Sequence, residues 1–121
     1  MPDAITTTIV VSAPPFASID GKEGVDLALV CAAFDHNVNL LFVDAGVLHL
    51  LATQDEAFYD DKMHDKQLKA LEFYDVERVF AEAESLLEFN LDKDDLIEAT
   101  EIIGREEINR LSLVSQHLVN F

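Results

Sequence analysis

The sequence predicts an α/β fold in which a largely parallel sheet is covered by helices on both faces. Short runs of hydrophobic and β-branched residues alternate along the chain with longer segments of helical periodicity. Strands that alternate with helices imply right-handed crossovers, which place the helices against the two faces of a mainly parallel sheet.

Length and composition indicate one domain spanning residues 1–121. The chain has 121 residues, of which 50% are hydrophobic, enough for one core but too few for two. No linker, internal repeat or low-complexity segment interrupts it.

The first strand and helix lie before residue 37. "TTTIVVSA" (6–13) is rich in β-branched residues and ends at two prolines, which cannot donate ladder hydrogen bonds, so it is the first predicted strand. "SIDGKEG" offers turn and capping residues. "VDLALVCAAFDH" (25–36) is apolar around most of its circumference and predicts a deeply buried helix.

The middle of the chain predicts a second strand and a second crossover. "NVNLLFVDAG" (37–46) is the strand, "VLHLLA" (47–52) a short helix, and residues 53–63 a polar loop. "HDKQLKALEFYD" (64–75) is a helix with Leu68, Leu71 and Phe73 as core candidates.

The last third supplies three more strands. "ERVFAEA" (77–83) predicts strand three, and "ESLLEFNL" (84–91) predicts a short helix after it. "DDLIEAT" (94–100) predicts strand four, and "HLVNF" (117–121) strand five. Between them, "REEINRLSLVSQ" is an amphipathic helix with Ile108, Leu111 and either Val114 or Ser115 on its apolar side.

Charge and cysteine content narrow the function classes. With 24 acidic and 8 basic residues, the formal charge of −16 opposes direct nucleic-acid binding. The acidic excess fits a solubilising surface, with a basic partner as the alternative. No apolar run approaches the roughly 20 residues of a membrane span, and no basic n-region opens the chain. The single cysteine fits a reducing compartment, so we expect a cytoplasmic protein without membrane association.

Cys31 is the one candidate thiol nucleophile, and its surroundings argue against that role. A reactive cysteine needs access and a lowered pKa, whereas "LALVCAAF" places it among apolar residues in mid-helix. His36 lies about 140° away around the helix. We therefore expect a packed cysteine, with a functional thiol as the alternative.

Neither the histidines nor the glycines form a ligand motif. His36, His49, His64 and His117 lack metal-ligand spacing, so each is expected to be solvated or singly hydrogen-bonded. "GKEG" matches neither phosphate-loop pattern, so Gly21 and Gly24 are expected to serve chain turning and close helix packing. The sequence predicts no cofactor and no metal.

The stretch "RVFAEAESLL" places Glu82, Glu84 and Ser85 where strand three turns into a helix. Carboxyl ends of parallel strands are the usual ligand position in open sheets, and two carboxylates could form an acid/base pair. The alternative, favoured on physical grounds, is local: Glu84 stabilises the helix dipole and Ser85 satisfies a free backbone N–H.

In order and spacing, four segments resemble the TusC/DsrF branch of the DsrE-like sulfur-relay superfamily. They are "GKEGVDLALV", "FVDAGVLHLL", "LKALEFYDVERV", and "IEATEI" with "EEINRL" and "LVNF". The resemblance covers nearly the whole chain. It implies a three-layer α/β/α domain with a five-stranded, mainly parallel sheet.

The resemblance also implies partners and a pathway. TusB-like and TusD-like subunits would join this chain in a dimer of heterotrimers, which passes persulfide sulfur through a TusE-like carrier toward 2-thiolation of the tRNA wobble uridine. A DsrF-like subunit would serve sulfur oxidation instead.

At the end of strand three, where catalytic subunits of the family carry their persulfide cysteine, this chain has Glu82. A carboxylate cannot carry persulfide sulfur, so the resemblance implies a non-catalytic structural subunit.

Five residues are candidates for the subunit interface. They are the apolar residues Val47, Leu48 and Leu50 and the aromatic pair Phe58 and Tyr59, because exposed aromatics in a polar loop often anchor partners. The alternative for the aromatic pair is that both side chains pack against the core of this chain and hold their own loop in place.

Two rival hypotheses remain. One is a sulfurtransferase that acts through Cys31. The other is a signalling or flavin-binding domain of similar topology, with Asp44 as a phosphate acceptor. The second fits poorly, because "VVSAPP" offers no acidic pair and no phosphate loop follows it.

Overall fold

The computed structural model describes residues 5–14, 20–34, 36–51, 78–97 and 100–121. Within them, five strands form one sheet of order β4-β3-β2-β1-β5, and every paired strand runs parallel to its neighbour. The strands are β1 (Thr6–Val11), β2 (Asn37–Phe42), β3 (Arg78–Glu82), β4 (Thr100–Ile103) and β5 (His117–Asn120). The predicted α/β class with a five-stranded parallel sheet is confirmed.

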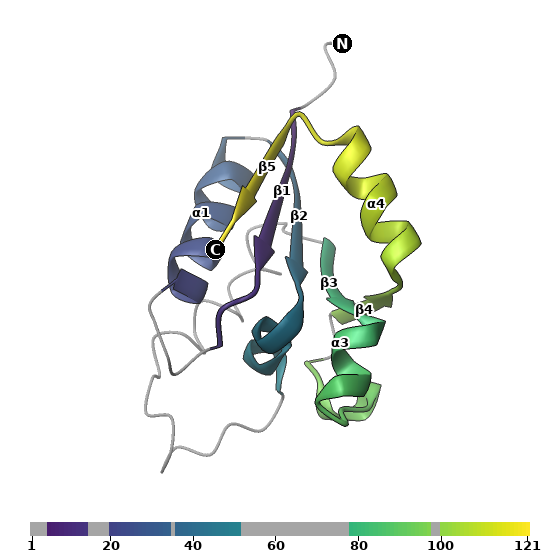
Figure 1. Ribbon diagram of the computed structural model, residues 1–121. Coiled ribbons are helices and arrows are strands. Elements are labelled where there is room, and N and C mark those ends of the chain that lie inside the picture. The colour runs from purple at the N-terminus through teal and green to yellow at the C-terminus, as the bar shows by residue number, and fades with distance from the viewer. Residues whose placement is uncertain (1–4, 15–19, 35, 52–77, 98–99) are drawn as a thin grey trace.

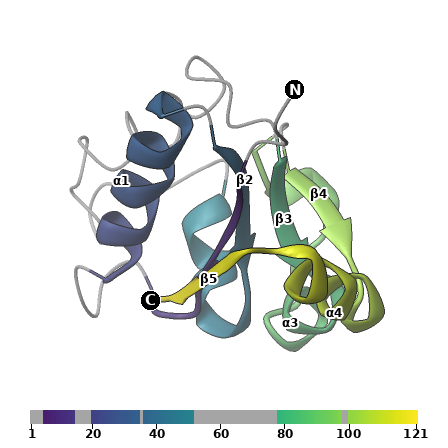
Figure 2. The ribbon, with the colours of Figure 1, turned by 90° about the horizontal axis from the view of Figure 1, so that it is seen from above.

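Helices cover both faces of this sheet and its carboxyl end. They are α1 (Asp20–Ala33), the 3-10 helices η1 (Asp44–Leu50) and η2 (Lys93–Asp95), α3 (Ala83–Glu88) and α4 (Arg105–Val114). Figures 1 and 2 show α1 and α4 on opposite sides of the sheet. In Figure 1 the strands point toward η1 and α3, so these two short helices lie beyond the strand ends.

The apolar core lies between the sheet and α1. Side chains alternate between the faces of a strand, so Ile9 and Val11 of β1 share a face with Leu40 and Phe42 of β2. All four are fully buried in one cluster that also contains Val25 of α1. Full burial of such a side chain stabilises the fold by about 1.5–3 kcal/mol, so this layer supplies most of the hydrophobic stabilisation.

The opposite face of the sheet, under α4, is more polar. Thr8 and Asn39 are buried there, and the Thr8 hydroxyl lies 2.5 Å from the Ser115 hydroxyl just beyond α4. Of the two candidates for the apolar side of this helix, Ser115 faces the sheet, whereas Val114 is 66% exposed.

The predicted strand four at 94–100 is wrong in its position. Residues 93–95 form η2, which a capping box between Asp92 and Asp95 holds. Leu96 then makes one antiparallel bridge to Leu51, and β4 begins only at Thr100. The apolar pair at 96–97 suggested a strand, but the acidic residues before it prefer a capped turn.

The first helix differs from its prediction in extent and in burial. It begins at Asp20 rather than residue 25 and ends at Ala33, before Phe34. Its burial is one-sided: Val30 is exposed and Phe34 is 74% exposed. The predicted deep burial therefore holds only for the face toward the sheet, because the structure describes nothing packed over the outer face.

The second strand ends earlier than predicted, at Phe42. Residues 44–50 form η1, which therefore begins three residues before the predicted short helix at 47–52. The predicted loop at 53–63 and helix at 64–75 lie outside the described residues. Among the described helices, none has the length and hydropathy that would let it cross a bilayer.

A close backbone approach at Gly46 fixes η1 against β1. A Cβ atom on Gly46 would lie 2.0 Å from the carbonyl oxygen of Val11 and 2.7 Å from its carbonyl carbon. Val43 N–H donates to that same oxygen at 3.0 Å. The glycine is required because no side chain fits between these two backbone segments.

We predict that Gly46→Ala lowers the free energy of unfolding by about 3 kcal/mol, since the added methyl group meets backbone that cannot rotate away. Urea denaturation followed by circular dichroism measures it. Gly104→Ala is the control, because its Cβ would meet the Glu84 carboxylate at an ordinary 3.6 Å, and it should cost about 1 kcal/mol or less. Equal losses in both variants would contradict the steric account.

Candidate functional site

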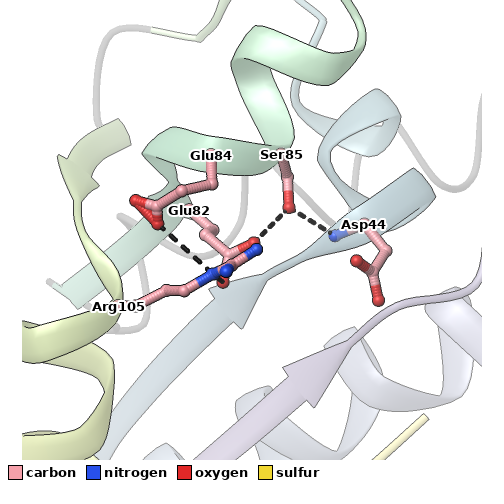
Figure 3. Close-up of polar contacts among 5 residues, drawn as sticks. All are labelled: Asp44, Glu82, Glu84, Ser85 and Arg105. Atoms are coloured by element: carbon pink, nitrogen blue, oxygen red, sulfur yellow. Dashed lines mark hydrogen bonds and ion pairs between the residues drawn. The ribbon is translucent and has the colours of Figure 1, made fainter.

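Residues from three strand ends meet at the carboxyl edge of the sheet. Glu82 is the last residue of β3, Asp44 follows β2, and Arg105 follows β4. Because β2, β3 and β4 are parallel neighbours, their ends lie side by side. Figure 3 shows the cluster that these residues form with Glu84 and Ser85 of α3, which we call the β3-end cluster.

Ser85 is the centre of the β3-end cluster. Its hydroxyl donates to Glu82 Oε1 at 2.5 Å and accepts a hydrogen bond from the Asp44 backbone N–H at 2.8 Å. Asp44 has a positive φ of 50°, which is uncommon outside glycine, and this conformation is held next to Ser85. The serine is 2% exposed, so its oxygen is fully engaged within the protein.

Arg105 adds one cation to two carboxylates. Its Nε atom lies 3.9 Å from Glu82 Oε2 and 3.6 Å from Glu84 Oε2. The arginine side chain is 74% exposed and the Glu82 side chain 13%. Solvent screens such pairs, so they contribute roughly 0–1 kcal/mol each and orient the carboxylates more than they stabilise the fold.

The two carboxylates differ in their partners. Glu82 is held by Ser85 and Arg105, whereas Glu84 Oε2 has no hydrogen bond within the described residues and only the ion pair with Arg105. Ser85 accepts a hydrogen bond from a backbone N–H, but the donor is Asp44 of another segment. The expectation that it satisfies a free N–H at the start of its own helix is therefore wrong.

The protein encloses the Ser85 hydroxyl at the centre of the β3-end cluster. This hydroxyl donates to the Glu82 carboxylate, and at 2% exposure the residue offers almost no surface to a substrate. In the part of the chain that the structure describes, no three His, Cys, Asp or Glu side chains are placed to hold a metal ion. The contacts hold β2, β3 and α3 together.

Cys31 lies at the other end of the molecule. It is close to the end of α1, and its carbonyl accepts a hydrogen bond from His36 N–H immediately before β2 begins. The six residues of β2 separate this edge from the β3-end cluster by about 20 Å. Cys31 is half-buried against the core, and burial raises the pKa of its thiol above the ordinary 9.0.

Two of the described histidines, His36 and His117, lie at the amino edge of the sheet on either side of Thr7, and His49 lies at the carboxyl end. His49 is buried in η1, its Nε2 atom lies 2.8 Å from the carbonyl oxygen of Ala13, and its ring contacts Phe42. His36 is half-buried beside Thr7, with Nδ1 3.3 Å from the threonine hydroxyl, and His117 is exposed. His64 lies outside the described residues.

The interface candidates divide three ways. Val47 and Leu50 are fully buried in the core of this chain, so naming them as interface residues was wrong: their side chains have no surface to offer a partner. The 3-10 helix η1 turns them inward beneath the strand ends. Leu48 is only half-buried. Phe58 and Tyr59 lie outside the described residues.

Two features of this region escaped the sequence reasoning. Arg105 seemed only to begin a helix, yet it reaches carboxylates 21 and 23 positions earlier in the chain. Asp44 and Ser85 are separated by 41 positions. The only sequence signal for either was that these residues directly follow strands, where parallel neighbours converge.

Solved structures with this fold support the architecture. A crystal structure of the YchN protein from E. coli superposes with a TM-score of 0.81, covering 97% of this chain and 100% of that protein at 17% identity. A protein of unknown function from Methanobacterium thermoautotrophicum gives a TM-score of 0.70 at 16% identity, covering 98% of this chain and 100% of that one. At these identities the similarity shows the fold alone.

Sequence relatives are more specific. A "Protein TusC homolog" of Vibrio parahaemolyticus is 30% identical over 107 residues, covering 88% of this chain and 91% of the relative. One from Haemophilus influenzae is 34% identical, covering 75% and 78%. The "Intracellular sulfur oxidation protein DsrF" of Allochromatium vinosum is 34% identical, covering 69% and 62%. A family model matches residues 6–121, and the chain therefore belongs to the DsrE/DsrF-like family.

Proposed function

We propose that this chain is a non-catalytic, structural subunit of a cytoplasmic sulfur-relay complex of the TusBCD type. That complex passes persulfide sulfur toward 2-thiolation of the tRNA wobble uridine. Family membership and the relatives named TusC support the sulfur-relay role. The observation that carries the non-catalytic role is Glu82 at the end of β3, bound to Ser85.

Persulfide transfer requires a thiol that can attack one sulfur and be attacked in turn. Glu82 offers two oxygens instead, and its negative charge would repel an approaching thiolate. The carboxylate is 13% exposed and hydrogen-bonded, so it also fills the space that a substrate sulfur would need. Sulfur chemistry is therefore assigned to a partner subunit.

Cys31 does not replace the missing thiol in this proposal. It lies at the opposite edge of the sheet, and burial raises the pKa of its half-buried thiol, which disfavours the thiolate that sulfur transfer needs. Its packing against the core gives it a structural role.

The partners are TusB-like and TusD-like subunits in a dimer of heterotrimers, with a TusE-like carrier as an indirect partner. A second candidate function is a DsrF-like subunit of a sulfur-oxidation complex. The DsrF relative from Allochromatium vinosum favours it, since its identity equals that of the Haemophilus TusC homolog.

We predict that this chain gains no sulfur when the co-expressed three-subunit complex is loaded with a persulfide donor. Intact-mass spectrometry of the separated subunits should show the extra sulfur on the D-type subunit. The Cys31→Ser substitution should leave the amount of sulfur on that subunit unchanged. Sulfur on this chain in the wild type that disappears in Cys31→Ser would support the sulfurtransferase hypothesis instead.

Glu82→Cys is the matched gain-of-thiol variant. It places a thiol at the end of β3, where the Arg105 guanidinium favours the thiolate. We expect this variant to take up sulfur that the wild-type chain does not. Failure of a folded Glu82→Cys chain to load would show that more than the nucleophile is missing from this edge.

We predict that the chain co-purifies with its B-type and D-type homologues and that native mass spectrometry finds equal numbers of the three subunits. Interfaces of obligate complexes persist at micromolar concentration because they bury large apolar areas. A chain that stays alone at that concentration with both homologues present would contradict the proposal.

We predict that Ser85→Ala destabilises the chain by about 1–3 kcal/mol, because the Asp44 N–H and the Glu82 carboxylate each lose a buried partner. Urea denaturation measures the loss. Ser112→Ala is the control: its hydroxyl bonds only the Ile108 carbonyl within α4, so stability should change by less than about 0.5 kcal/mol. Sulfur loading of the complex should survive both substitutions, and its loss in Ser85→Ala would give the cluster a chemical role.

A further inference from the structure

A hollow of about 330 Å³ opens at the amino edge of the sheet, at the far end of the strands from the β3-end cluster. It lies where β1, β2 and β3 begin, beside the last turns of α4. The residues that line it are Thr6, His36, Asn37, Val38, Asn39, Arg78, Leu111 and Val114. Its volume falls at the lower end of the range for small-molecule pockets.

Arg78 supplies a cation that is not neutralised within the described residues. Its guanidinium lies over the Phe80 ring, 5.6 Å from the centroid, and none of the described ion pairs includes it. None of the described lining residues is acidic, although the chain carries a net charge of −16. Among its described lining residues the hollow thus carries one arginine and no carboxylate, a composition that suits a carboxylate or similar anion.

Asn39 lies directly beside Arg78, because the two residues are register partners on adjacent strands. The Asn39 side chain is buried at 3% exposure and lines the hollow. Partners in a parallel pair are about 4.8 Å apart and point to the same face. Both residues line the hollow, so one bound molecule can contact both of them.

A chain of hydrogen bonds fixes which end of that amide is available. The Ser115 hydroxyl donates to the Leu111 carbonyl, so it must accept from Thr8, whose hydroxyl lies 2.5 Å away. The Thr8 oxygen then accepts from Asn39 Nδ2 at 3.3 Å. Since the one hydroxyl proton of Thr8 is used, the Asn39 amide nitrogen must face Thr8, and the amide oxygen faces away from it. That oxygen accepts a hydrogen bond from a ligand, and the nitrogen keeps one further N–H.

One wall of the hollow is apolar, while Thr6, His36 and Asn37 add further polar groups to the lining. Leu111 and Val114 of α4 line the hollow, and Val114 is 66% exposed without a ligand. A short aliphatic group placed there would remove both side chains from water. Arg78 and Asn39 on one side and two apolar side chains on the other suit a small ligand that has both a polar and an aliphatic end.

We propose that this hollow binds a small aliphatic carboxylic acid with a hydrogen-bond donor on the neighbouring carbon, that is, a 2-hydroxy acid or a 2-amino acid. The carboxylate accepts hydrogen bonds from Arg78, the donor bonds the Asn39 oxygen, and the aliphatic group contacts Leu111 and Val114. This site lies at the opposite edge from Glu82 and does not depend on the proposed relay function.

Amide chemical shifts of the 15N-labelled full chain test the proposal with three probes of equal carbon skeleton. They are 2-hydroxy-4-methylpentanoate, leucine and 4-methylpentanoate, which lacks the donor. At least one of the first two should shift the amides of residues 37–39 and 111–114 with a millimolar dissociation constant, as expected for about nine non-hydrogen atoms. It should bind about fivefold more tightly than 4-methylpentanoate. The tighter of the two identifies the donor.

Arg78→Gln should weaken that binding about tenfold, because the charge-assisted hydrogen bonds are lost. Arg110→Gln is the matched control, because Arg110 is exposed on α4 and pairs with Glu107. The affinity of this variant for the probe should equal that of the wild-type chain. The proposal is overturned if no probe gives a saturable shift, if 4-methylpentanoate binds as tightly as the others, or if Arg78→Gln binds normally. The proposal is also overturned if the amide chemical shifts of residues 37–39 and 111–114 change only when a partner subunit is added. The hollow would then be a protein-docking surface.

Discussion

The contact between Gly46 and the Val11 backbone is the constraint on which the carboxyl edge of the sheet depends. It lets η1 lie directly against the end of β1, where Val43 donates to the Val11 carbonyl. With η1 held there, the Asp44 N–H points at Ser85, and the hydroxyl of Ser85 then fixes Glu82. One missing side chain thus sets the geometry of three neighbouring strand ends.

The two ends of the sheet have opposite hydrogen-bonding character. At the carboxyl end, Ser85 and Glu82 satisfy one another within the chain. At the amino end, Arg78 and the Asn39 oxygen have no such partners among the described residues. At the usual ligand position of a parallel sheet, the protein's own side chains therefore bond one another. At the opposite edge, hydrogen-bonding groups among the described residues have no partner within the described part of the chain.

Much of this fold could be predicted from sequence because β1, β2 and β3 are runs of mainly buried β-branched and apolar residues. The fourth strand could not, since "DDLIEAT" carries apolar residues that serve a single bridge at Leu96, while the strand itself starts at Thr100. The helix at 20–33 began earlier than its apolar pattern suggested, because Gly24 packs against Val11 instead of breaking the helix. Site contacts such as Asp44 to Ser85 depend on tertiary placement, which local patterns do not encode.

The shortness of the outer strands has a consequence for self-association. β4 and β5 have four residues each, so each open side of the sheet offers a ladder of only about 13 Å to another chain. Two copies meeting there would also bring together chains of charge −16. Edge-to-edge pairing of identical folded copies is thus opposed both by the little backbone available for pairing and by electrostatic repulsion.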